Sequence, residues 1–215
     1  MPYAKQHGLE IIELAHPRGT LYQKITGDPY RGYLIPAYFV SRKGNIVRGR
    51  RQCTSEQKVD VIDKWLRDHG GKAGSLVGLG ISADEADRVK PNVDEDTMAW
   101  KTLAWPLLFD VPRPYTRQDC VNVIEDAGIP VPPRSACKYC PYHQLSYWQD
   151  LRTNSPVEFW QMVALEKLLG DRQVEHGQPR IFFTRLGKPL DKITTEEFNQ
   201  PTLFGDMCES GYCMV

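Results

Sequence analysis

The sequence predicts an α/β fold followed by a helical extension. Short apolar runs typical of strands occupy residues 9–15, 75–82 and 103–109. Apolar residues recur at helical spacing in residues 55–69, 116–127 and 156–169. Strand and helix segments that follow one another along a chain are typical of α/β domains.

Glycine and proline separate these elements. Residues 17–35 contain glycine and proline but no hydrophobic period, so we expect a loop there. Residues 35–40 are apolar but include Pro36, which cannot donate to a ladder, so they predict an edge strand. Residues 91–99 are acidic and predict an exposed loop, whereas residues 180–186 predict a short strand.

Polar residues mark the expected helix starts. Thr54 or Ser55 is expected to cap the first helix, and Thr116 the second. The third helix is expected to have Ser155 as its cap and Pro156 at its first position. Its wide apolar face predicts a helix that packs in the core rather than a ligand site.

The composition indicates one domain, or one domain with an extension. The chain has 215 residues, of which 41% are hydrophobic. Its 27 basic and 27 acidic residues balance, so the net charge favours neither nucleic acid nor a membrane, although a local basic groove stays open. No apolar run is long enough to span a bilayer. Six cysteines without a readable signal peptide predict a cytoplasmic protein with metal or redox chemistry rather than disulfides.

Cys137-Lys138-Tyr139-Cys140-Pro141 carries the strongest chemical signal. Two thiols at this spacing can bind one soft metal from a single turn, and thiolate selects zinc, copper(I) or iron–sulfur centres. A proline directly after the second cysteine is typical of iron–sulfur runs. Half of a structural zinc site, a redox pair and a chance pair of buried thiols are the alternatives. The proline-rich loop at residues 129–133 does not provide the strand-to-helix context of a redox pair.

Residues 42–51 form a basic segment that leads to Cys53. A cysteine at the start of a helix among arginines is expected to be partly thiolate, the form that binds metal. The clustered basic residues can also contact phosphate, so the segment is a candidate nucleic-acid contact. A solvated loop with a half-buried thiol is the alternative. Cys120, by contrast, is expected to pack in the core, as free cysteine often does.

Residues 75–82 predict a buried strand that runs into a charged loop at residues 84–90. Open α/β sheets bind ligands at such strand ends, which makes the loop a candidate site. Most charged loops are only solvated, and that alternative stays open.

Three blocks occur in one order: Arg51-Gln52-Cys53-Thr54 with Lys58, the strand that leads into residues 80–85, and residues 105–141 with the Cys-x-x-Cys. They resemble the phosphoadenosine phosphosulfate (PAPS) reductase family of the adenine-nucleotide alpha-hydrolase (PP-loop) superfamily. The resemblance is greatest to its uncharacterised cysteine-rich proteins of phages and actinobacteria, and it covers nearly the whole chain. It implies a Rossmann-like, adenine-nucleotide alpha-hydrolase-like sheet.

The resemblance also implies a [4Fe-4S] cluster held by Cys53, Cys137 and Cys140. Cluster-bearing members have a Cys-Cys pair before the helix, whereas Thr54 takes the second position here. Three thiolates would leave one iron open, as in the cluster-dependent tRNA thiolation enzymes of the superfamily, unless a cysteine of the tail supplies the fourth ligand. Zinc is the alternative metal.

The phosphate loop of the superfamily, Ser-Gly-Gly-x-Asp-Ser, does not occur in these residues. By resemblance, the chain therefore starts just before the third strand of a truncated or split sheet. ATP or a phosphosulfate nucleotide is expected to bind only if a second polypeptide supplies the loop; a homo-oligomer is the alternative partner. Arg51, Lys58 and Arg88 could hold a phosphate by charge-assisted bonds, but they cannot replace backbone amides.

The leading hypothesis is an iron–sulfur protein for reductive sulfur chemistry or sulfur transfer on an adenylylated substrate. PAPS reductases have a reactive cysteine on a mobile tail, and Cys208 and Cys213 occupy a similar place as candidate catalytic thiols. The alternatives are a non-enzymatic zinc-stabilised module that binds nucleic acid or protein, and a remnant without activity. We expect a partial PP-loop-type domain at residues 1–135, a cysteine-motif and helical extension at 136–203 and a tail at 204–215.

Overall fold

The computed structural model describes residues 2–27, 35–70, 74–89, 100–132 and 136–200. Its α-helices are α1 (Pro2–Gln6), α2 (Leu21–Gly27), α3 (Asp60–His69), α5 (Pro106–Phe109), α6 (Arg117–Asp126), α7 (Leu145–Asn154), α8 (Pro156–Glu175) and α9 (Thr195–Phe198). A π-helix, η1 (Ser55–Val59), and two 3-10 helices, η2 (Ala83–Arg88) and η3 (Leu190–Lys192), accompany them. The strands are β1 (Tyr38–Val40), β2 (Ile46–Arg48), β3 (Ser75–Gly78), β4 (Lys101–Ala104) and β5 (Ile181–Phe182).

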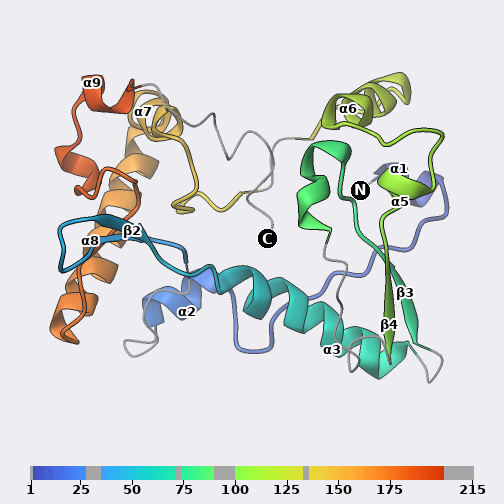
Figure 1. Cartoon of the computed structure of the whole chain (residues 1–215), viewed down its shortest axis with the longest axis horizontal. Coiled ribbons are helices and arrows are strands. Elements are labelled where there is room, and N and C mark those ends of the chain that lie inside the picture. The colour runs from blue at the N-terminus through green and yellow to red at the C-terminus, as the bar shows by residue number, and fades with distance from the viewer. Residues whose placement is uncertain (1, 28–34, 71–73, 90–99, 133–135, 201–215) are drawn as a thin grey trace.

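The fold is mixed α/β, as the sequence predicts. Its described strands form two small sheets, an antiparallel sheet in the order β2-β1-β5 and a parallel pair β3-β4. Figure 1 shows β2 with α7, α8 and α9 on one side and β3 and β4 with α5 and α6 on the other. The helix α3 runs between the two groups.

The main hydrophobic core lies where α7 and α8 cover the antiparallel sheet. Phe159, Met162, Leu165 and Leu169 of α8 are buried, at the spacing of one helix face, which confirms the predicted core face. Burying a side chain of this size contributes about 1.5–3 kcal/mol. The predicted face is too wide, however, because Trp160 of the same helix is 58% exposed.

The core draws residues from both ends of the chain. Ile25, Ile35 and Ala37 pack with α7, α8 and α9 in one cluster. Residues on both sides of the expected boundary at 135/136 therefore share a core, while the expected boundaries themselves stay a prediction.

The strand β1 is the central strand of its sheet, so the predicted edge strand is wrong. Tyr38 pairs with Arg48 of β2 on one side and with Phe182 of β5 on the other. Pro36 precedes the first ladder residue, and its missing N–H is therefore not needed. The hairpin between β1 and β2 turns at Gly44, whose φ of 79° favours glycine.

The parallel pair corrects two further predictions. The predicted strand at 75–82 forms from Ser75 to Gly78, but it is not buried, since Leu76 is 75% exposed. Residues 103–109 are strand only as far as Ala104. Pro106 then occupies the first turn of α5, a position that proline favours because its missing N–H has no helical partner there.

The helix that follows Cys53 is confirmed, although its predicted cap is not. Thr54 has helical dihedral angles and accepts no capping hydrogen bond, and Ser55 already belongs to η1. Lys101 of β4 donates to both carboxylate oxygens of Asp63 on α3, each at 2.9 Å, and both side chains are largely buried. This ion pair joins α3 to the parallel pair.

The first 35 residues differ most from expectation. Residues 9–15 form no strand, and their apolar side chains Leu9, Ile11, Ile12 and Leu14 are exposed. The helix α2 occupies part of the predicted loop at 17–35 and buries Ile25 in the core. Packing against α8 therefore stabilises α2, although the local sequence pattern does not indicate a helix there.

The remaining helix starts are mostly as predicted. Thr116 caps α6 in a capping box with Asp119, and Pro156 occupies the first turn of α8. Ser155 occupies the N-cap position of α8, as predicted, but its side chain makes no capping hydrogen bond. The predicted strand at 180–186 is confirmed at Ile181 and Phe182.

Two predictions cannot be placed. The acidic loop at 91–99 and the tail at 204–215, with Cys208 and Cys213, lie outside the described residues. In the part of the chain that the structure describes, every helix is too short or too polar to cross a bilayer.

Candidate functional site

The Cys-x-x-Cys forms a tight turn just before α7. The N–H of Cys140 donates to the carbonyl of Cys137 at 2.9 Å, and the N–H of His143 donates to the carbonyl of Cys140 at 3.1 Å. The ring Nε2 of His143 lies 2.8 Å from the Cys137 carbonyl oxygen. These hydrogen bonds to backbone carbonyl oxygens close the turn.

Aromatic packing fixes this turn against the core. His143 stacks on Tyr147 with ring centroids 3.6 Å apart, and it meets the edge of the buried Trp148. Burial lowers the pKa of His143, so the ring is neutral near pH 7. Pro141 is fully buried in the same turn. The proline after the second cysteine thus has a packing role here.

Cys53 lies at the start of the helical turn that leads into η1, far from the Cys-x-x-Cys in sequence. The structure brings the three thiols into one neighbourhood. Burial raises the pKa of Cys140 to about 11, and the charges of Cys137 and Cys53 both add to that rise. The charge of Arg51 acts in the opposite direction.

Tyr139, between the two cysteines, contacts the same group of thiols. Burial raises the pKa of its hydroxyl most, followed by the charge of Cys137 and a side-chain hydrogen bond with it. Cys53 and Cys140 contribute in the same direction. The ring centroid of Tyr139 also lies 6.1 Å from that of Tyr22 on α2, a helix that the sequence did not predict.

The donor chemistry of these three residues suits a soft metal, because thiolates select zinc and iron–sulfur centres. Cys137 is exposed, whereas Cys53 and Cys140 are half-buried. Among the described residues, however, no group of three or more His, Cys, Asp or Glu side chains is already arranged to hold an ion. Metal binding here therefore requires the thiols to move together from their present positions.

Cys120 does not belong to this group. It is half-buried on α6, and its pKa is raised first by burial and then by the charges of Asp119 and Asp84. Asp84 lies on η2, which follows β3, and Asp119 lies on α6 itself. The expectation that Cys120 packs in the core is therefore wrong, because it is only half-buried and lies outside the main core cluster.

The expected phosphate-binding residues lie on three different segments. Arg51 is half-buried beside the ring of Tyr142. Lys58 is exposed on η1. Arg88 forms a salt bridge with Glu85 at 2.8 Å, and both side chains are largely buried, so Arg88 has a structural role within η2.

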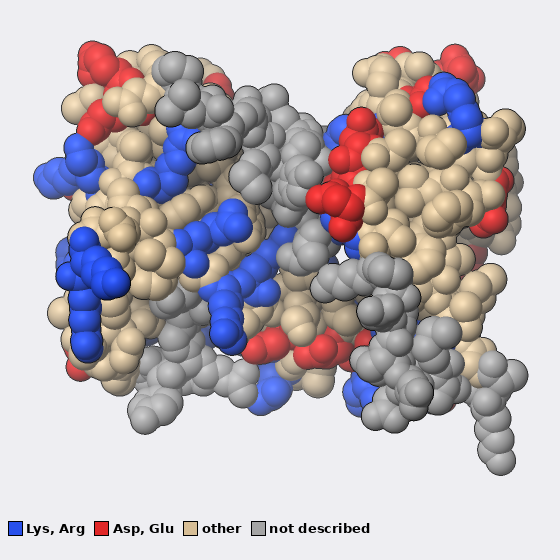
Figure 2. All heavy atoms as spheres, viewed as in Figure 1, with Lys and Arg blue, Asp and Glu red and all other residues tan. Residues whose placement is uncertain are grey.

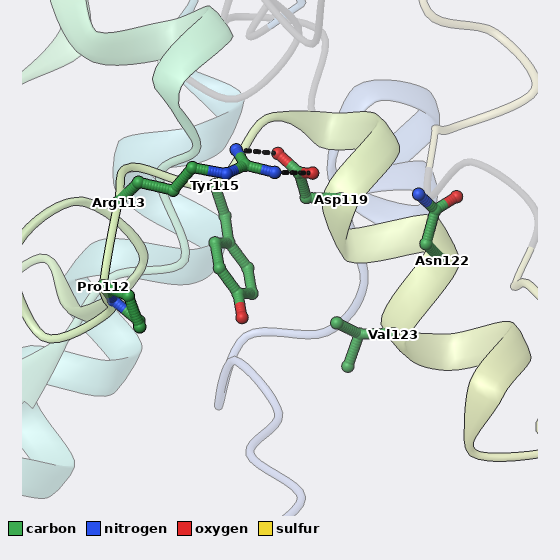
Figure 3. A pocket seen from close by; sticks show the side chains of 6 residues that line it. All are labelled: Pro112, Arg113, Tyr115, Asp119, Asn122 and Val123. Carbon is green, nitrogen blue, oxygen red and sulfur yellow. Dashed lines mark hydrogen bonds and ion pairs between the residues drawn. The ribbon is translucent and has the colours of Figure 1, made fainter.

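A separate surface pocket of about 390 Å³ lies beside α6 (Figure 3). Arg113 donates to both carboxylate oxygens of Asp119 at its rim, and Tyr115, Asn122 and Val123 line it further. The arginine charge is neutralised by that pair, so the pocket offers polar contacts without a free charge. None of the thiols named above lines it.

The sequence analysis included Arg48 in the basic segment 42–51 but missed the two tyrosines beside it, Tyr38 and Tyr142. Arg48 lies over the ring of Tyr142 and is paired across the hairpin with Tyr38. The signal that could have found the pairing of Arg48 with Tyr38 is Gly44 in a five-residue loop between two short apolar runs, since a loop of this length that contains glycine indicates a hairpin.

A scan against protein-family models and searches of curated proteins and of solved structures find no match to the chain.

Proposed function

We propose that this chain is an iron–sulfur protein of the PAPS-reductase-like group, acting in reductive sulfur chemistry or in sulfur transfer on an adenylylated substrate. The observation that carries the proposal is the mutual influence of three thiols. Cys53 affects Cys140 and Tyr139 electrostatically although it comes from a distant part of the chain. Thiolates are the ligands that zinc and iron–sulfur centres prefer, so three neighbouring cysteines support a soft-metal site.

Cys53, Cys137 and Cys140 would hold a [4Fe-4S] cluster, which supplies one-electron redox chemistry when bound. The raised pKa of Cys140 means that its proton must leave as metal binds, so loading is favoured by higher pH. Tyr139 hydrogen-bonds with Cys137 and would tune the sulfur charge from the second coordination sphere. The hydroxyl of Tyr147 donates to the carbonyl oxygen of Lys138 at 3.2 Å, which holds the backbone of the turn between the two cysteines.

The nucleotide half of the reaction is proposed to come from outside these residues. The parallel pair β3-β4 would be part of a larger Rossmann-like sheet, and the phosphate loop would be supplied by a second polypeptide. The exposed face of the pair supports this proposal, because parallel sheets are normally covered on both faces.

Anaerobic purification followed by iron, sulfide and zinc analysis tests the proposal. We expect iron and sulfide with absorption from thiolate-to-iron charge transfer, and loss of both in Cys53→Ser, Cys137→Ser and Cys140→Ser. The matched control is Cys120→Ser, which removes a thiol outside the group and should keep the cluster. Full iron and sulfide content in Cys53→Ser would refute the three-ligand site.

The same measurement separates the proposal from its main alternative. A colourless protein with one bound zinc would favour a zinc-stabilised binding module. A wild-type protein that takes up neither metal would leave the thiols as structural residues only and would overturn both.

A further inference from the structure

The pocket beside α6 has an apolar wall formed by three side chains. In Figure 3 the ring of Tyr115 points into the space between Pro112 and Val123. Two backbone hydrogen bonds hold Tyr115 in place: its N–H donates to the carbonyl of Leu107 at 2.8 Å, and its carbonyl accepts from the N–H of Ala83 at 2.7 Å. The wall is therefore preformed, as is usual for ligand sites.

The hydrogen-bond acceptors of the pocket are already occupied. The Asp119 carboxylate accepts two hydrogen bonds from Arg113 and two from the cap residue of α6. The amide oxygen of Asn122 accepts from the side chain of Gln118 at 2.9 Å. Within the described residues, the amide nitrogen of Asn122 and the hydroxyl of Tyr115 make no hydrogen bond and stay available as donors. The pocket therefore suits a neutral ligand that offers carbonyl oxygens and few donors of its own.

A proline-rich segment has this chemistry. Proline has no backbone N–H, so such a segment presents carbonyl oxygens and apolar rings but few donors. The residue before each proline is restricted to extended conformations, so little conformational entropy is lost when the segment binds. Aromatic-lined grooves recognise proline-rich segments for these reasons.

The chain itself carries a segment of this kind. Residues 130–132, with the sequence Pro-Val-Pro, follow α6 and are exposed. Their carbonyl oxygens accept no hydrogen bond from any described backbone N–H. The N–H of Ile129 donates to the carbonyl of Ile124 at 3.1 Å, which fixes the start of the segment at the C-terminal end of α6. The segment begins about 10 Å beyond Asn122 along the helix axis and lines no part of the pocket of its own chain.

The surface around α6 permits two copies to approach each other. In Figure 2 the part of the molecule that carries α5 and α6 shows mainly uncharged side chains, whereas Lys and Arg side chains gather on the part that carries β2. The chain as a whole has a formal net charge of +0. Two identical surfaces can therefore meet at α6 without strong repulsion between like charges.

We propose that the pocket binds residues 130–132 of a second copy of the chain, with α6 of one copy antiparallel to α6 of the other. The pocket lies beside the first half of α6, and the segment follows the opposite end of the helix. A two-fold axis near the middle of α6 therefore places each segment at the pocket of the other copy. The two equal contacts form together, so each strengthens the other.

Light scattering of the full-length chain over a range of concentrations tests the proposal. We expect a reversible dimer whose dissociation constant rises about tenfold in Asn122→Asp, because the substitution replaces a donor by an acceptor of nearly equal shape. The double variant Pro130→Ala with Pro132→Ala should also dissociate more readily, since alanine restores backbone N–H groups and chain flexibility. Asn45→Asp, the same substitution in the β1–β2 hairpin, is the matched control and should dimerise like the wild type.

A synthetic peptide with the sequence of residues 128–133 tests the contact without any change in the protein. In excess, it should occupy the pocket and convert the wild-type dimer to monomer, whereas the peptide with alanine at positions 130 and 132 should not. Thermal unfolding of each variant checks that its fold is intact. A wild type that is monomeric at every concentration, a dimer that survives excess peptide, or equal dissociation constants for wild type and Asn122→Asp would each overturn the proposal.

Discussion

The Glu166 carboxylate on α8 accepts a hydrogen bond from the backbone N–H of Phe183, with 2.6 Å between the nitrogen and Oε1. Its other oxygen accepts from the N–H of Leu190 at 2.8 Å. One buried side chain thus fixes both ends of the segment that joins β5 to η3. Arg185 lies within that segment.

This relationship predicts a pH-dependent stability. Burial raises the pKa of Glu166 from 4.5 to about 7, against the two backbone hydrogen bonds that lower it. The folded chain therefore binds more protons than the unfolded chain between these values. The contribution of Glu166 to the unfolding free energy is fully present below about pH 4.5 and falls by about 3 kcal/mol as the pH rises through about 7.

Denaturant unfolding at a series of pH values measures this slope. Glu166→Gln should remove it and should lower stability by about 1–3 kcal/mol in acid, since an amide nitrogen cannot accept the second backbone bond. Glu175→Gln, at an exposed position of the same helix, is the control and should keep the slope. An unchanged slope in Glu166→Gln would contradict the assignment.

The capping box of α6 predicts a local stability effect. The Thr116 hydroxyl accepts from the N–H of Asp119 at 3.2 Å, and the Asp119 carboxylate accepts from the N–H of Thr116 at 2.8 Å. Thr116→Ala should lower the unfolding free energy by about 1 kcal/mol, whereas Thr116→Ser keeps the hydroxyl and should cost little. Chemical denaturation of both variants checks this, and equal midpoints would show that the cap contributes nothing.

Nucleotide binding by this chain alone is predicted to be weak. Without a loop of backbone amides, only point charges such as Arg51 are left to hold the phosphates of ATP or of a phosphosulfate nucleotide. Calorimetric titration should show a weak interaction that disappears as salt is raised. Micromolar or tighter affinity that resists salt would mean that these residues contain a complete phosphate site.

Deleting residues 205–215 separates two roles for the tail cysteines. We predict that Cys208 and Cys213 act as redox thiols, because a thiol that attacks a sulfur centre must then be released by a second thiol. The deletion should leave the cluster spectrum unchanged and remove two alkylatable cysteines together with any thiol-dependent turnover. Loss of iron on deletion would instead make one of them the fourth ligand.

Periodicity and helix signals predicted the long helices well. The core face of α8 and the Thr116 cap of α6 follow from local spacing and side-chain chemistry, which do not depend on the rest of the chain. Which side chains are buried could not be predicted from local spacing in the same way. Leu76 resembles a core residue in sequence, yet it is 75% exposed, because its side chain projects from a face of β3 that the described residues leave uncovered.

The candidate site could be predicted only in part. The Cys-x-x-Cys is a local signal, and its link to Cys53 came from a family resemblance. The proximity of Arg48 to Tyr142 could not be read from one local segment, because it depends on the register of the antiparallel sheet and on the turn before α7. Long-range pairing of this kind is decided by the whole fold.

Cys53 precedes the N-terminal end of α3. Further along the helix, Asp63 forms the ion pair with Lys101 of β4, and Arg67 lies over the ring of Trp100. Its 10 residues form a rod about 15 Å long. The length of α3 therefore sets the distance between the Cys53 sulfur atom and the parallel strands β3 and β4. Any length change in α3 would alter that separation by about 1.5 Å for each residue added or removed.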